Sequence, residues 1–178
     1  MTNFEYLKNI PEYKLFASAC TEAERVFSTS AAMCAVGSRK ALELAVKWVY
    51  SADKTMKMPY RDNIQSLVHE PSFRFALNQQ TWSKLQFIIK LGNLAVHTEK
   101  HISKSDAVLS LSGLFEFVEW INYCYSKDYV ERAFDEKLIP AEKVNLNYSS
   151  WPEKKLLDHI IMYFKKFFRF HLKSEARV

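Results

Sequence analysis

Hydrophobic residues recur along most of this chain with the spacing of amphipathic helices. Leu15, Ala19, Ala23 and Phe27 stand at every fourth position and predict a helix that begins near Pro11. Similar patterns predict further helices over approximately residues 4–8, 31–50, 61–69, 82–96, 106–121, 127–138 and 150–173. The chain therefore reads as a succession of helices.

Polar residues and prolines punctuate this pattern. Side chains suited to N-capping precede several of the predicted helices: the run 28–30, Thr81, Ser103 or Ser105, and Ser150. Pro71 and Pro140 follow predicted helices and should end them, because proline lacks the N–H that a helix interior needs.

The same pattern fixes the expected fold class. Alternating runs typical of strands are weak, and the chain has only 3 Gly and 5 Pro, which disfavours a turn-rich β design. We predict an all-α, up-and-down helical bundle of four to five main helices over residues 1–140. Residues 141–178 should add a loop and a basic amphipathic helix that packs on the bundle or on a partner.

Three features of the sequence bear on location. No apolar run reaches the roughly 18 residues of a transmembrane helix, and the N-terminal residues lack the pattern of a signal peptide. Cys20, Cys34 and Cys124 are widely spaced, so we expect buried free thiols. Together these features predict a cytoplasmic protein that does not enter a membrane.

The charge is uneven along the chain. The net charge is +5, and the last 28 residues hold most of it. This basic end predicts contact with an anionic partner such as DNA or RNA, or simply a solvated helix face. The binding candidates there are Lys154, Lys155, Lys165, Lys166 and Arg169.

Known catalytic and cofactor motifs are missing: the sequence has no phosphate-binding glycine loop, no nucleophile elbow and no zinc-binding pair of histidines. We therefore expect neither a metal nor a cofactor. What remains is a set of polar residues within apolar helices: Arg39, Glu43, Asn93 and His97.

Two interpretations of this polar set stay open. Arg39 could pair with Glu43, four residues away on one helix, while Asn93 and His97 hydrogen-bond within the bundle. Alternatively, the set cleaves RNA without a metal, with His97 as acid or base, Asn93 orienting it and Arg39 holding the phosphate. Gly92, in the middle of its helix, indicates close approach of another group.

Three stretches together resemble a known family. They are Asn3–Lys8, Ser38–Lys47 and Lys90–His97. In this order they resemble the HEPN-like domain found at the N-terminus of type I restriction enzyme R subunits, over about residues 3–126. In active HEPN nucleases an Arg precedes the position of Asn93, with the catalytic His at the position of His97. Here Gly92 stands in place of that Arg, so Arg39 or Lys90 would have to replace it.

The resemblance implies a function. The expected one is a non-catalytic accessory domain of a restriction-modification or related defence system, acting in nucleic-acid contact or in assembly with other restriction subunits. The binding candidates of the bundle are Arg39, Glu43 and Lys90. One alternative is a metal-independent ribonuclease of toxin or abortive-infection type that uses His97 and works as a homodimer. Another is a protein-interaction module.

Overall fold

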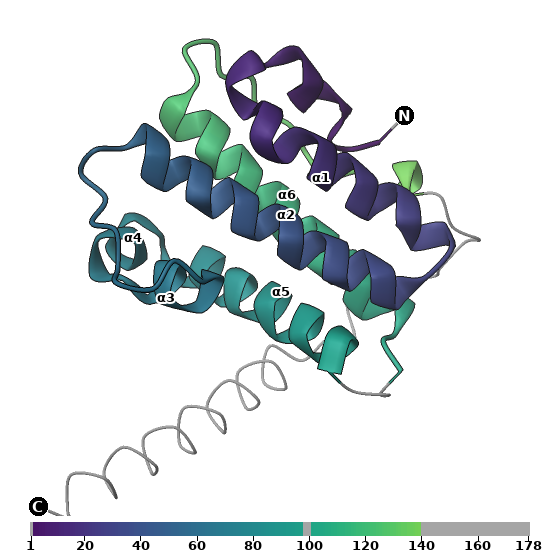
Figure 1. Ribbon diagram of the computed structural model, residues 1–178. Helices are drawn as coiled ribbons and strands as arrows, with labels where there is room; N and C mark the ends of the chain where they lie inside the picture. The colour runs from purple at the N-terminus through teal and green to yellow at the C-terminus, as the bar shows by residue number, and fades with distance from the viewer. Residues whose placement is uncertain (1, 98–100, 140–178) are drawn as a thin grey trace, which may run out of the picture. The chain divides into compact units, whose positions relative to one another are not determined.

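The computed structural model describes residues 2–97 and 101–139, and every regular element in these ranges is helical (Figure 1). The four long helices are α1 (Lys14–Arg25), α2 (Ala31–Ala52), α5 (Gln79–His97) and α6 (Lys104–Tyr125). The short elements are η1 (Glu5–Asn9), η2 (Pro11–Tyr13), η3 (Val26–Ser28), α3 (Ile64–His69), α4 (Pro71–Ala76) and η4 (Glu136–Leu138). The predicted all-α bundle is confirmed. The chain falls into two compact units, Met1–Val144 and Asn145–Val178, and the predicted C-terminal helix lies outside the described residues.

Helix α2 is the centre of the first unit. It packs against α1, α5 and α6, and α5 packs in turn on α6 (Figure 1). Ala31 and Ala35, early in α2, meet Leu91 and Leu94, late in α5, so these two helices run antiparallel. The buried faces are apolar and rich in aromatic side chains, including Tyr13, Phe16, Phe27, Phe73 and Phe117.

Side-chain caps define where the long helices begin. Ser30 Oγ accepts from the N–H of Met33 at 3.2 Å, and Ser103 Oγ accepts from the N–H of Asp106 at 3.0 Å, as predicted. Thr81 is not a cap. Helix α5 starts earlier, and Asn78 Oδ1 accepts from the N–H of Thr81 at 2.8 Å.

The prolines behave differently from the prediction at one point. Pro71 does not simply end a helix, because it opens α4 directly after α3. Its missing N–H suits a first turn, and the Glu70 carboxylate caps that turn by accepting from the N–H of Ser72 at 2.7 Å.

Three further predictions were wrong. Residues 127–138 form no helix except the short turn η4. Leu15 is exposed, and the buried stripe of α1 instead contains its neighbour Phe16, with Cys20 and Ala23. Cys124 is an exposed thiol, whereas the other two cysteines are buried and free as expected.

The residues before α1 tie distant parts of the bundle together. The backbone N–H and the Nδ2 of Asn3 both donate to the buried Glu24 carboxylate of α1, at 2.9 Å each. Asn3 Oδ1 also accepts from the N–H of Asp135 at 2.7 Å, and Asn3 Nδ2 donates to the Asp135 carbonyl at 3.0 Å. One amide side chain thus joins the N-terminus, α1 and the segment after α6.

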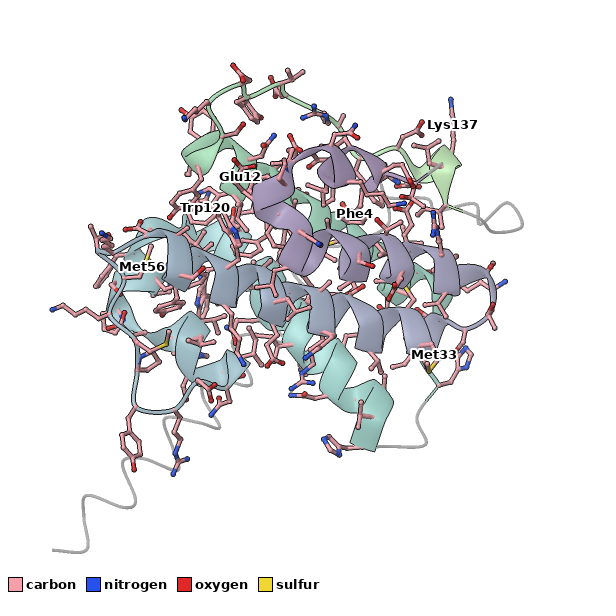
Figure 2. All side chains as sticks on the ribbon, turned by 45° about the horizontal axis from the view of Figure 1, so that its top comes forward. Phe4, Glu12, Met33, Met56, Trp120 and Lys137 are labelled. Atoms are coloured by element: carbon pink, nitrogen blue, oxygen red, sulfur yellow. The ribbon has the colours of Figure 1, made fainter. Side chains whose placement is uncertain are left out.

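A second contact reinforces the first. The Tyr6 hydroxyl donates to Glu119 of α6, whose other carboxylate oxygen accepts from the N–H of Arg132 at 3.3 Å. The Arg132 guanidinium stands 4.1 Å above the centre of the Tyr6 ring. We call these six residues the N-terminal clasp: Asn3, Tyr6, Glu24, Glu119, Arg132 and Asp135. In Figure 2 the labels Phe4 and Lys137 show where the N-terminal segment and the segment after α6 lie. The Lys137 side chain points away from the bundle.

Candidate functional site

The polar residues of α5 lie on one side of that helix. At about 100° per residue, Gln86, Lys90, Asn93 and His97 fall within an arc of about 60°. Asn93 and Gln86 are half-buried, while Lys90 and His97 are exposed. We call these four residues the α5 polar strip. Gln86 was missed in the sequence, although its spacing of seven residues from Asn93 could have revealed it.

Arg39 of α2 packs directly on Gly92 of α5. A Cβ atom added to Gly92 would lie 2.5 Å from Arg39 Cβ, 2.8 Å from Arg39 Cδ and 3.1 Å from the carbonyl oxygen of Ala35. The aliphatic stem of Arg39 therefore occupies the space that a side chain at position 92 would need. The close approach predicted from the mid-helix glycine is confirmed, and the approaching group is the arginine.

The guanidinium of Arg39 has no acidic partner among the residues that the structure describes. Its Nε atom is buried and makes no hydrogen bond within those residues. The pair with Glu43 does not form, because Glu43 binds Lys47 at 3.1 Å instead. A buried donor without an acceptor costs about 1–3 kcal/mol.

The geometry separates Arg39 from His97. Gly92, under the Arg39 stem, and His97 are five residues apart, which is about 140° around an ideal helix and about 7.5 Å along it. The side chains of Asn93 and His97 make no hydrogen bond to each other in the described part of the chain. The structure therefore brings the stem of Arg39 onto α5 at Gly92, about 140° around that helix from His97.

The buried acids of the bundle serve the clasp. Burial raises the pKa of Glu24, although its hydrogen bonds from Asn3 oppose that rise. Burial and the Glu119 carboxylate together raise the pKa of Tyr6 well above its ordinary value. These groups hold chain segments together and do not line the α2–α5 contact.

Other kinds of site find little support within the described ranges. No group of three or more His, Cys, Asp or Glu side chains lies close enough there to hold a metal ion. None of the helices described is long and apolar enough to cross a membrane. The predicted basic residues Lys154, Lys155, Lys165, Lys166 and Arg169 lie outside the described residues.

Comparison with known proteins gives one match. No curated protein and no solved structure is significantly similar to the chain. Residues 21–141 match a family described as a domain of unknown function, DUF4145. This range is more than half of the chain and contains Arg39, Gly92, Asn93 and His97. The chain therefore belongs to the DUF4145 family.

Proposed function

We propose that this chain is a HEPN-like accessory domain of a restriction-modification or related defence system that contacts nucleic acid and does not cleave it. The observation that carries the proposal is the contact between Arg39 and Gly92. A half-buried arginine that has no acidic partner among the described residues suits a phosphate group, which accepts charge-assisted hydrogen bonds.

The arrangement of His97 argues against catalysis. A general acid or base must be held within reach of the proton that it transfers. His97 is exposed, lacks a hydrogen bond from Asn93, and lies well around α5 from Arg39. A phosphate held by Arg39 would thus not be presented to the His97 ring within a single chain.

The test uses labelled RNA and the full chain in the presence of EDTA. We expect the RNA to remain intact over hours and to bind with an affinity that falls as salt rises, because phosphate contacts release counterions. Cleavage that the wild type shows and His97→Ala lacks would establish the alternative ribonuclease and overturn this proposal. Absence of any binding at low salt would also overturn it and favour a protein-interaction module.

A further inference from the structure

Three large apolar side chains are exposed near the far end of α2. Tyr60 is fully exposed, at 103%, Phe75 is 85% exposed and Met58 is 60% exposed. Met58 and Tyr60 lie in the connection between α2 and α3, and Phe75 lies on α4. Figure 2 labels Met33, near the start of α2, and Met56, in the loop just after its end, and this surface lies on the Met56 side. We call it the aromatic surface.

The connection that carries Tyr60 is anchored at two points, both of them before Tyr60 in the sequence. The N–H of Lys57 donates to Ser72 Oγ of α4 at 3.0 Å, and Asp53 Oδ2 accepts from the Tyr125 hydroxyl at 3.0 Å. Phe75 follows Ser72 by three residues, so on a helix it stands on the same side, one turn along. The hydrogen bond of Lys57 thus holds the loop against α4, one turn before Phe75.

The charges around this surface favour an anionic partner. The acidic groups are already engaged: Asp53 accepts from Thr55 at 2.9 Å, and Asp62 lies 3.7 Å from Lys47. Glu70 caps α4, and its bond from the Ser72 hydroxyl lowers its pKa. In contrast, three exposed cations make no ion pair with any described residue: Lys54, Lys57 and Arg61.

We propose that the aromatic surface binds single-stranded nucleic acid, with bases stacked on Tyr60 and Phe75 and phosphates near Lys57 and Arg61. Exposed rings beside cations suit a strand whose bases are unpaired, because a duplex hides the base faces. The surface goes beyond the contact proposed for Arg39. Thirteen residues of α2 separate Arg39 from Ala52, about 20 Å along the helix, so the two proposals can fail separately.

Fluorescence anisotropy with a fluorescein-labelled 12-nucleotide oligo-dT strand tests the inference. Tyr60→Ala and Phe75→Ala should each weaken binding by about tenfold, whereas Tyr60→Phe should bind like the wild type because the ring remains. The matched control is Tyr123→Ala, which removes a tyrosine of α6 that is 68% exposed and should leave affinity unchanged. All three positions are exposed, so circular dichroism should show native helix content in each of the four variants.

A labelled duplex of equal length completes the test and should bind at least several-fold more weakly than the single strand. Wild-type affinity in Tyr60→Ala and Phe75→Ala, an equal loss in Tyr123→Ala, or equal affinity for the duplex would each overturn the inference. Loss of binding in Arg39→Gln with no change in Tyr60→Ala would support the proposed function and overturn this surface. The reverse pattern would support the surface and overturn the role of Arg39.

Discussion

Gly92→Ala is expected to lower the free energy of unfolding by about 1–3 kcal/mol, the usual cost of an extra methyl group in a packed core. The sign of this change in unfolding free energy is its informative feature. In an open mid-helix position the same change would stabilise the protein by about 1 kcal/mol, because alanine is the better helix former. The added Cβ would lie 2.5 Å from Arg39 Cβ and 3.1 Å from the Ala35 carbonyl oxygen, and neither is the movable end of a side chain.

Gly113→Ala in α6 is the matched control. Its added Cβ would lie 3.3 Å from Lys84 Cβ and 3.5 Å from Ile88 Cδ1, which are closer to ordinary contacts. Urea denaturation should therefore show Gly113→Ala nearer to neutral than Gly92→Ala. In the double variant Gly92→Ala/Arg39→Gly the alanine should cost less than it does alone, giving a coupling of at least about 0.5 kcal/mol between the two sites. Additive effects, or a stabilising Gly92→Ala, would contradict the Arg39–Gly92 contact.

Glu24→Ala should have the second large effect, a loss of about 2–4 kcal/mol of stability. The substitution leaves two buried donors of Asn3 without an acceptor, and each such donor costs about 1–3 kcal/mol. Glu24→Gln keeps one acceptor and should lose less. Glu22→Ala, at an exposed position of the same helix, should change stability by less than about 0.5 kcal/mol. A Glu24→Ala variant as stable as Glu22→Ala would show that the clasp contributes nothing.

The clasp also predicts a pH dependence. Because the folded state raises the pKa of Glu24, folding favours its protonated form. The stabilisation from Glu24 is then complete below its ordinary pKa of 4.5 and is lost as the pH rises through the raised value. The unfolding free energy of the wild type should accordingly fall, relative to that of Glu24→Gln, as the pH rises above 4.5. A difference that stays constant with pH would contradict the raised pKa.

Much of the bundle could be predicted from local sequence. The helical periodicity and the caps Ser30 and Ser103 are local signals, and the structure bears them out. The segment 127–138 could not be read in this way, because the contacts of Arg132 with Tyr6 and of Asp135 with Asn3 hold it in a largely non-helical conformation. Those partners lie more than a hundred residues away in the sequence.

The candidate site was predictable only in part. The mid-helix position of Gly92 indicated that some group approaches it closely. Which group does so depends on the register between α2 and α5, which places Arg39 against Gly92. Glu43 pairs with Lys47 within α2 itself, and the register between α2 and α5 places His97 around α5 from the Arg39 stem. The aromatic surface gave no periodic signal, because it lies in a loop and a short helix whose side chains are recognised only by their exposure.

The central claim is that Arg39 contacts nucleic acid, and the salt dependence of binding tests it most directly. Affinity for a labelled RNA strand should be measured between about 50 and about 200 mM salt for the wild type, Arg39→Gln and Lys40→Gln. Both variants lose one positive charge from α2. Lys40 is the control because it is exposed and next to Arg39 in the sequence. Gln at position 39 keeps the aliphatic stem that packs on Gly92. We predict that Arg39→Gln alone weakens binding and reduces the salt slope by about one. Equal effects of the two substitutions, or wild-type binding by Arg39→Gln, would contradict the account.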